Sequence, residues 1–151
     1  EAPDAFARRL AREKAAAVWQ NAPHGFVLAA DTIVVTEDEV LGKPKDAADA
    51  VRMLRKLSGQ THDVITAVCL MLPTGKQDVR HEVTRVHMKP LSEEEIGFYV
   101  GSGEPLDKAG AYGIQGLASR WVDRVEGNYF NVMGLPVALV YGMLREHQAL
   151  P

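Results

Sequence analysis

Hydrophobic and polar positions repeat along the chain at two different spacings, and each spacing predicts a different element. Near the start, Phe6, Leu10 and Val18 recur at helical intervals, and Pro3 suits the first turn of a helix. The same face carries three small residues, Ala7, Ala11 and Ala15. This pattern predicts an amphipathic helix at the beginning of the chain.

The next apolar stretch predicts a strand over residues 26–35. An apolar run from Phe26 to Ala30 leads to Asp31 and Thr32, and a second run, Ile33–Val35, follows. A carboxylate in a buried strand requires a partner, because an isolated charge in an apolar medium is costly. Lys43 follows twelve residues later, between a glycine and a proline. The pair fits either a metal–phosphate site or a structural ion pair beside a hairpin.

The middle of the chain predicts one helix and a strand pair. Asp46 begins the helix and Gly59 ends it, with an inward face of three residues, Met53, Leu54 and Leu57. Residues 61–72 and 78–88 have strand patterns and are joined by the turn at 73–76. The valines of the second strand break strict alternation, which predicts a bulge or a strong twist.

The last third predicts two helices, a glycine-rich loop and a strand. Ser92 and Glu95 form a capping box before a short helix, and the segment 107–121 contains three glycines within seven residues. Residues 121–125 favour a strand, and Pro136 begins a final helix. Together these elements predict a single α/β domain over residues 1–151, with a mixed sheet and helices on its faces.

Composition limits the function classes. The chain has 151 residues and a formal net charge of −3, which does not favour non-specific binding to nucleic acid. No apolar run approaches the ~20 residues of a membrane helix, so no membrane partner is expected. The lone Cys69 lies in an apolar run and is expected to be buried. A single cysteine cannot form an internal disulfide, which favours a cytoplasmic location.

The candidate chemistry lies in dispersed polar residues. The five histidines are scattered without a zinc-ligand spacing, and the sequence has no P-loop, GxSxG or GxGxxG motif. The polar residues that remain are found beside turns, at strand ends or on adjacent helices: Lys14, Asp31, Thr32, Lys43, Asp107, Lys108 and Gln115. Such a pattern suits metal-assisted phosphate chemistry, which depends on positioning and charge. For Asp107 and Lys108, a phosphate contact and an internal ion pair are equally good interpretations.

Seven segments, in order, resemble the Maf family of nucleoside triphosphate pyrophosphatases, the septum-formation-inhibitor-like proteins. They are LAREKA (10–15), AADTIVV (29–35), LGKPKDAADA (41–50), LRKLSGQTH (54–62), LSEEEI (91–96), SGEPLDKAGAYGIQG (102–116) and VEGNYFNVMGLP (125–136). The resemblance implies an elongated α/β fold like that of the inosine triphosphatases, with two lobes around a central cleft. It also implies hydrolysis of a nucleoside triphosphate to monophosphate and pyrophosphate, with Mg²⁺ or Mn²⁺ as cofactor and a homodimer as the assembly.

The resemblance assigns roles to five residues. Asp31 matches the family's proton acceptor and is also the expected metal ligand. Lys14 and Lys43 match its phosphate-side lysines, while Thr32 and Gln115 match two substrate-selecting positions. Glutamine in the GIQG segment resembles the branch acting on dTTP and UTP. The amide of Gln115 complements the O4 and N3–H edge of thymine or uracil, although it would also serve to hold its own loop.

One family element has no counterpart in the sequence. The family begins with an SxSPRR loop that binds phosphate, and this chain starts beyond that point and is predicted to be N-terminally short. Three explanations are open: a fragment, which we favour; a truncated and weakly active protein; or a site completed by another chain. The alternative function is therefore an impaired nucleotide-binding regulator or a cell-division interaction module. The resemblance implies pyrophosphatase activity for the family, and whether the chain as it stands has this activity is left open.

Overall fold

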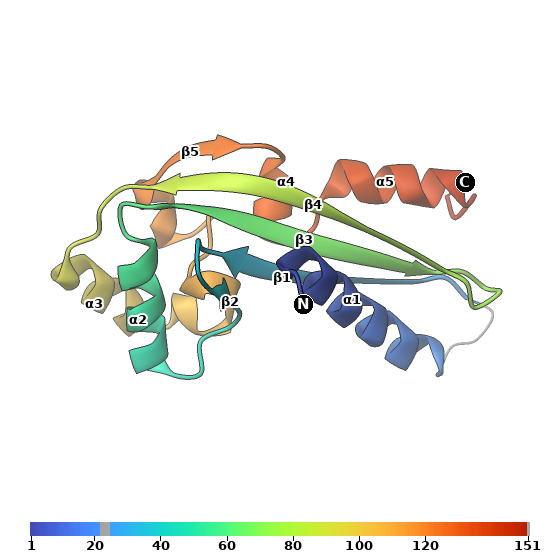
Figure 1. Cartoon of the computed structure of the whole chain (residues 1–151), viewed down its shortest axis with the longest axis horizontal. Coiled ribbons are helices and arrows are strands. Elements are labelled where there is room, and N and C mark those ends of the chain that lie inside the picture. The colour runs from blue at the N-terminus through green and yellow to red at the C-terminus, as the bar shows by residue number, and fades with distance from the viewer. Residues whose placement is uncertain (22–24, 151) are drawn as a thin grey trace.

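The fold is built on one five-stranded sheet in the order β2-β1-β3-β4-β5 (Figure 1). The computed structural model describes residues 1–21 and 25–150. The strands are β1 (Val27–Val35), β2 (Val40–Leu41), β3 (Thr61–Met71), β4 (Gln77–Met88) and β5 (Val122–Glu126). All four strand pairs are antiparallel. The predicted α/β class is confirmed, but the expectation of a mixed sheet is wrong for the described strands.

The long hairpin of β3 and β4 forms the axis of the molecule (Figure 1). Its register runs without a break from Thr61 opposite His87 to Met71 opposite Gln77, so the predicted bulge is absent from this pair. The irregularity lies on the other edge of β4, between His87 and Met88, where β5 pairs. A register shift there lets the sheet bend toward the glycine-rich segment.

Strand β3 is covered on both faces because its side chains alternate. Ala67, Cys69 and Met71 pack against helix α1 (Pro3–Trp19), whereas Val68 and Leu70 pack against helix α5 (Val137–Glu146). An alternating strand with two apolar faces is typical of the centre of a layered domain.

Helix α1 buries small residues rather than large ones. Ala7, Ala11 and Ala15 are fully buried, whereas Val18 is 55% exposed, so the expectation that Val18 faces the core is wrong. Alanines at the contact let the helix lie close to β1 and β3, which brings its polar side chains near the strand ends.

The opposite end of the sheet carries the larger core. Helices α2 (Ala47–Leu57) and α3 (Glu93–Gly101) pack there with the sheet and with Tyr99 and Trp121, whose rings meet edge to face. Asp46 caps α2 and the Ser92–Glu95 capping box begins α3, as predicted. The sheet thus joins two lobes, one beside α1 and α5 and the other beside α2 and α3 (Figure 1).

Short helices connect the second lobe to the rest. They are 3-10 helices at Glu104–Asp107, Ala109–Ala111 and Leu117–Trp121 and helix α4 (Tyr129–Met133). Gly110 has a φ of +72°, and a Cβ there would lie 2.6 Å from Cγ2 of Val34. Only glycine therefore allows this turn to pack directly on β1.

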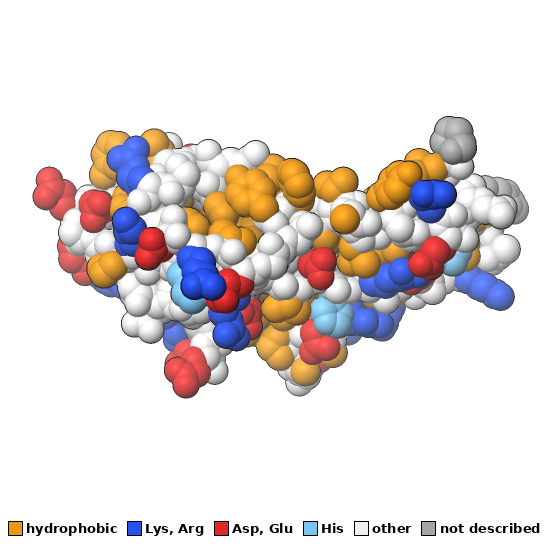
Figure 2. All heavy atoms as spheres, turned by 90° about the horizontal axis from the view of Figure 1, so that it is seen from above, with side chains coloured by type: hydrophobic (Ala, Val, Ile, Leu, Met, Phe, Trp, Pro, Cys, Tyr) orange, Lys and Arg blue, Asp and Glu red, His pale blue; other side chains and the backbone are white. Residues whose placement is uncertain are grey.

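A band of exposed hydrophobic side chains lies on α4 and α5. Its members are Tyr129, Phe130, Met133, Leu135, Val137 and Tyr141. Figure 2 shows hydrophobic side chains gathered over the middle of the molecule and over the end where α5 lies. We call the surface formed by these six residues the α4–α5 band. Among the described residues, no helix is long and apolar enough to cross a membrane.

Candidate active site

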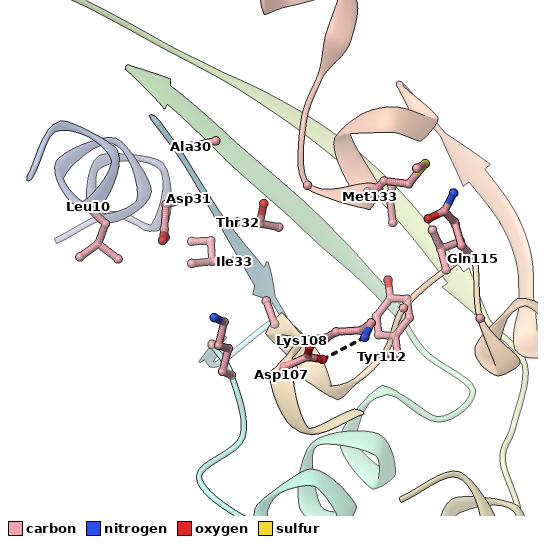
Figure 3. A pocket seen from close by; sticks show the side chains of 18 of the residues that line it. Leu10, Ala30, Asp31, Thr32, Ile33, Asp107, Lys108, Tyr112, Gln115 and Met133 are labelled. Atoms are coloured by element: carbon pink, nitrogen blue, oxygen red, sulfur yellow. Dashed lines mark hydrogen bonds and ion pairs between the residues drawn. The ribbon is translucent and has the colours of Figure 1, made fainter. Parts of the chain in front are cut away.

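A cavity of about 700 Å³ opens between the two lobes. Its walls come from α1, β1, the segment after β2, the 3-10 helices and the end of α4 (Figure 3). The cavity brings together all five residues that the sequence singled out: Lys14, Asp31, Thr32, Lys43 and Gln115. Residues that lie up to 101 positions apart in the sequence therefore share one site.

Asp31 and Lys14 form the charged wall beside α1. Nζ of Lys14 lies 2.5 Å from Oδ1 of Asp31 and also donates to the carbonyl oxygen of Ala30 at 3.3 Å. The Asp31 side chain is only 14% exposed, whereas that of Lys14 is 56% exposed. Strand β1 fixes the carboxylate, and the tightly packed helix delivers the ammonium. This pair offers both a proton acceptor and a positive charge to a ligand.

Lys43 adds a second positive charge from the segment after β2. That segment is tied to the other lobe, because the backbone N–H of Gly110 donates to the carbonyl oxygen of Gly42 at 3.0 Å. Within the described residues, Lys43 has no ion-pair partner. The pKa of Asp107 is lowered mainly by the hydrogen bond from Lys108, and the positive charge of Lys43 lowers it to a smaller extent. Lys43 is therefore available to an anion in the cavity.

Asp107 and Lys108 pair with each other at 2.9 Å on the same side of the cavity (Figure 3). Nζ of Lys108 also donates to the carbonyl oxygen of Glu104 at 3.1 Å. The internal ion pair is thus present, and the pair still lines the cavity. These contacts hold the loop and leave Lys108 partly satisfied before any ligand binds.

The glycine-rich segment forms the other end of the cavity and is held by buried polar bonds. Nε2 of His62 lies 2.6 Å from the Tyr112 hydroxyl, and the Gly113 N–H donates to the Tyr99 hydroxyl at 3.1 Å. The Leu117 N–H donates to Oε1 of Glu104 at 3.2 Å. These bonds fix a segment that lacks regular structure.

Gly116 packs closely against the Glu104 side chain. A Cβ at Gly116 would lie 2.1 Å from Oε1 of Glu104, a distance at which the carboxylate would have to move. The Glu104 carboxylate therefore lies directly against the backbone that carries Gln115. None of the hydrogen bonds among the described residues involves the Gln115 side chain, so its amide is left to contact a ligand.

Thr32 belongs to a buried polar network behind the cavity. Its hydroxyl lies 2.9 Å from that of Thr66, and Thr66 donates to the carbonyl oxygen of Asn131 at 3.0 Å. Asn131 is fully buried, and its amide donates to the carbonyl oxygens of Val64 and Glu82 and to the Thr84 hydroxyl. Thr32 is thus oriented before a ligand binds.

Asn131 lies within helix α4 but is not its cap. Asn128 caps helix α4, because its Oδ1 accepts from the Asn131 N–H at 3.0 Å. The Asn131 amide instead crosses to β3 and β4 and fixes the wall formed by Val132, Met133 and Gly134. A fully buried amide position has no signature in sequence pattern alone.

Three further residues of the site were missed by the sequence analysis: His62, Glu104 and Tyr112. Glu104 and Tyr112 line the cavity, and His62 lies behind Tyr112. The histidine was set aside because it has no ligand spacing, yet it is buried at the start of β3. A histidine near the beginning of a predicted strand was the only available signal.

The residues of the cavity fit a divalent metal bound together with a phosphate ligand. Three carboxylates line the cavity, those of Asp31, Glu104 and Asp107. Mg²⁺ is typically held by one or two carboxylates, waters and substrate phosphates rather than by a protein cage. Asp31 is the carboxylate best placed for this role, since it is fixed on a strand beside Lys14.

A cluster of three possible metal ligands lies elsewhere. Asp78, Glu146 and His147 have ligand atoms within 4.8 Å of one another. Arg80 pairs with both carboxylates, and His147 lies 2.8 Å from Asp78, so the cluster already contains its counter-charges. The pKa of Asp78 is lowered mainly by its bond with Arg80. We interpret the cluster as an ion-pair network that holds α5 to β4.

Fold and cavity together define an α/β protein with a charged cleft between two lobes. The chain matches the Maf-like protein family over residues 1–147, and it belongs to that family. The predicted family membership is confirmed by this match.

Relatives with assigned names share this similarity over almost the whole chain. A dTTP/UTP pyrophosphatase of Koribacter versatilis is 57% identical over 145 residues, which cover 96% of this chain and 75% of that protein. A dTTP/UTP pyrophosphatase of Syntrophomonas wolfei is also 57% identical over 145 residues, which cover 95% of this chain and 77% of that protein. The dTTP/UTP pyrophosphatase of Aquifex aeolicus is 49% identical over 144 residues, which cover 95% of this chain and 75% of that protein.

Proposed function

We propose that the protein is a nucleoside triphosphate pyrophosphatase that hydrolyses dTTP and UTP to the monophosphate and pyrophosphate. The observation that carries the proposal is the arrangement of the cavity, in which Asp31, paired with Lys14, and Gln115 lie on opposite sides (Figure 3), and which Lys43 also lines. The names of relatives 49% to 57% identical support the same activity. A cavity of about 700 Å³ also suits a ligand of nucleotide size.

Asp31 acts as the proton acceptor in this proposal. A water molecule attacks the α-phosphorus, its proton passes to the Asp31 carboxylate, and the bond from the α-phosphorus to the bridging oxygen breaks to release pyrophosphate. The side chain is fixed on β1 and largely buried, which limits its motion. Lys14, 2.5 Å from Asp31, holds the carboxylate in its orientation before the water arrives.

Lys14 and Lys43 neutralise the triphosphate as point charges. A divalent metal bound to Asp31 would supply further charge neutralisation at the phosphate oxygens. Lys43 has no competing ion pair among the described residues, so it loses no internal contact when a phosphate binds. We therefore expect Lys43 to contribute more binding free energy than Lys108, which is already paired.

Gln115 selects the base. Its amide offers one acceptor and one donor group, which match the N3–H and O4 edge of thymine or uracil. The other interpretation, that Gln115 ties down its own loop, loses support because Tyr99, Glu104 and His62 provide those ties. Thr32, whose hydroxyl is held by Thr66, lines the cavity as the second selecting position.

The experiment that tests the function is a product assay with a nucleotide panel. The chain is incubated with Mg²⁺ and dTTP, UTP, ATP or GTP, and pyrophosphate and orthophosphate are measured separately. The proposal expects pyrophosphate from dTTP and UTP above that from the purine nucleotides. Release of orthophosphate instead, or no preference among the bases, would contradict it.

We also propose that the chain forms a homodimer through the α4–α5 band. Large contiguous apolar surfaces on soluble proteins mark interaction sites, and the band contains three aromatic side chains, Tyr129, Phe130 and Tyr141. Light scattering after size exclusion should give the mass of two chains. A Phe130→Glu variant should give the mass of one chain, and an unchanged dimer mass in that variant would exclude the band as the interface.

A further inference from the structure

The buried pair of His62 and Tyr112 has a hydrogen-bond pattern that the proposed function does not use. His62 is 2% exposed and its Nε2 lies 2.6 Å from the Tyr112 hydroxyl oxygen. The other ring nitrogen, Nδ1, is buried and has no hydrogen-bond partner among the described residues. The two rings meet edge to face with centroids 5.4 Å apart. One ring nitrogen is therefore satisfied and one is not.

Burial keeps this histidine neutral. Desolvation lowers the pKa of His62 from 6.5 to about 4, although the nearby Asp63 carboxylate opposes the shift. His87 lowers the pKa slightly further. A neutral imidazole has one N–H donor and one bare acceptor, and the proton must lie on either Nδ1 or Nε2.

The two tautomers leave different groups unpaired. With the proton on Nδ1, the Tyr112 O–H donates to Nε2, and a buried N–H is left without an acceptor. With the proton on Nε2, His62 donates to the Tyr112 oxygen, a lone pair is left on Nδ1, and the Tyr112 O–H is left for an acceptor in the cavity that Tyr112 lines. Each tautomer leaves one donor without a protein acceptor, but the Nδ1–H would be enclosed, whereas the Tyr112 O–H belongs to a residue that lines the cavity and can bond to water or a ligand there. The Nε2–H tautomer is therefore favoured.

This tautomer leaves the Tyr112 hydroxyl proton without an acceptor inside the protein. Tyr112 is buried to 95% by its surroundings, yet it is one of the residues that line the cavity. In Figure 3 its hydroxyl points away from the glycine-rich segment, toward the space between Thr32 and Met133. The proton can be donated only in that direction.

We infer that Tyr112 is a substrate-binding residue that donates a hydrogen bond to an acceptor oxygen of the nucleoside, and that His62 is the positioning residue that orients its hydroxyl. The inference rests on the proposed function, since it places a nucleotide in this cavity. Tyr112 precedes Gln115 by three residues, and in Figure 3 it lies between the Asp107–Lys108 pair and Gln115. The end with Gln115 carries the nucleoside, whereas the lysine-rich end beside α1 carries the phosphates.

The acceptor is an oxygen of the base or the sugar rather than of a phosphate. Burial raises the pKa of Tyr112, so the phenol keeps its proton over the whole working range of pH and can act as a donor. The neutral Tyr112 hydroxyl adds little affinity for the charged triphosphate, because the lysines already neutralise the phosphate charges. It adds discrimination, because an unpaired buried hydroxyl disfavours a ligand that lacks the matching acceptor.

The first test reads the tautomer directly in the wild-type chain. Long-range ¹H–¹⁵N correlation spectra of the His62 ring distinguish a protonated Nε2 from a protonated Nδ1. We expect Nε2 to be protonated without ligand and with a non-hydrolysable dTTP analogue bound. A proton on Nδ1 in the ligand-bound form means that Tyr112 donates to His62, and it would overturn the inference.

The second test compares two ligands that differ by the nucleoside. Tyr112→Phe removes only the hydroxyl oxygen, and Tyr141→Phe, on the exposed face of α5, is the matched control. Binding of the dTTP analogue and of inorganic tripolyphosphate is measured by calorimetry. For Tyr112→Phe we expect Kd for the analogue to rise roughly threefold to tenfold, the range of one hydrogen bond, and Kd for tripolyphosphate to stay unchanged.

The remaining outcomes separate this inference from the proposed function. Unchanged binding of the analogue, or an equal loss for both ligands, would overturn the role of Tyr112. A wild-type chain that binds the analogue with the expected Tyr112 dependence but releases no pyrophosphate would overturn the proposed function alone. A wild-type chain that binds tripolyphosphate but no analogue would overturn both.

Discussion

The two ends of the cavity are built in different ways. At the phosphate end, Lys14 and Asp31 are carried by a helix and a strand that share an apolar core. At the nucleoside end, Tyr112 and Gln115 are carried by an irregular segment that is held by hydrogen bonds from buried side chains. Under the proposed function, rigid elements position the reacting groups, while a loop with polar anchors positions the groups that select the ligand.

The largest expected effect is at the phosphate end. Asp31→Asn keeps the shape of the side chain but removes the proton acceptor, which typically lowers the turnover rate by ~10²–10⁴-fold. Turnover is measured as pyrophosphate release from dTTP, with circular dichroism to show that the fold is retained. Asp107→Asn is the matched control, because Asp107 also lines the cavity but pairs with Lys108. A wild-type rate in Asp31→Asn would remove Asp31 from the mechanism.

This end of the cavity was predictable because it depends on pattern. An apolar strand that carries a carboxylate is conspicuous in the sequence, and the structure places Asp31 on β1 as expected, although its ion-pair partner there is Lys14 rather than Lys43. The capped helices α2 and α3 and the long hairpin follow from local signals of the same kind. The antiparallel pairing of every described strand was missed, because strand direction depends on contacts between segments distant in the sequence.

The nucleoside end was predictable only in part. The glycines indicated a tight segment, but the anchors His62 and Asn131 are single polar residues whose partners lie 47 to 67 positions away. Periodicity carries no information about such pairs. The face of α1 was misjudged for a related reason, since close approach favours alanine over the larger Val18.

The second effect concerns the wall behind the nucleoside end. Asn131→Ala removes the amide whose two N–H groups are shared among the carbonyl oxygens of Val64 and Glu82 and the Thr84 hydroxyl. We expect the free energy of unfolding to fall by on the order of 3 kcal/mol, because each buried group left unpaired costs ~1–3 kcal/mol. Urea denaturation provides the measurement. Asn128→Ala, which removes only a helix cap, should cost about 1 kcal/mol, and equal losses in both variants would refute the network's importance.

The third effect is a pH dependence of stability. His62 is neutral in the folded chain below its ordinary pKa, since burial lowers that pKa from 6.5 to about 4. Between pH 6.5 and 4, His62 binds a proton in the unfolded chain but not in the folded chain. The free energy of unfolding is therefore highest above pH 6.5 and falls as the pH is lowered to 4. The loss reaches on the order of 3 kcal/mol at ~1.4 kcal/mol per pKa unit. Denaturation at pH 7 and pH 4.5 should show a smaller difference for His62→Gln than for wild type, and equal differences would show that His62 does not titrate in this way.

The smallest effect is on base choice. Gln115→Glu replaces an amide with a group that only accepts, which leaves a base carbonyl unpaired at roughly 1–3 kcal/mol. We expect kcat/KM for dTTP and UTP to fall by about one to two orders of magnitude relative to a purine triphosphate. Rates on all four nucleotides provide the ratio. An equal fall for every base would show that Gln115 does not read the base.

The division of the cavity into two ends is tested most directly by a crossed binding measurement. Tripolyphosphate and a non-hydrolysable dTTP analogue are titrated, with Mg²⁺, into wild type, Lys43→Ala and Gln115→Glu. The account predicts that Lys43→Ala weakens both ligands by the same factor, because Lys43 contacts only phosphate. It predicts that Gln115→Glu weakens the dTTP analogue and leaves tripolyphosphate unchanged. If Gln115→Glu weakened both ligands equally, or if Lys43→Ala weakened only the nucleotide, the division of the cavity into two ends would be contradicted.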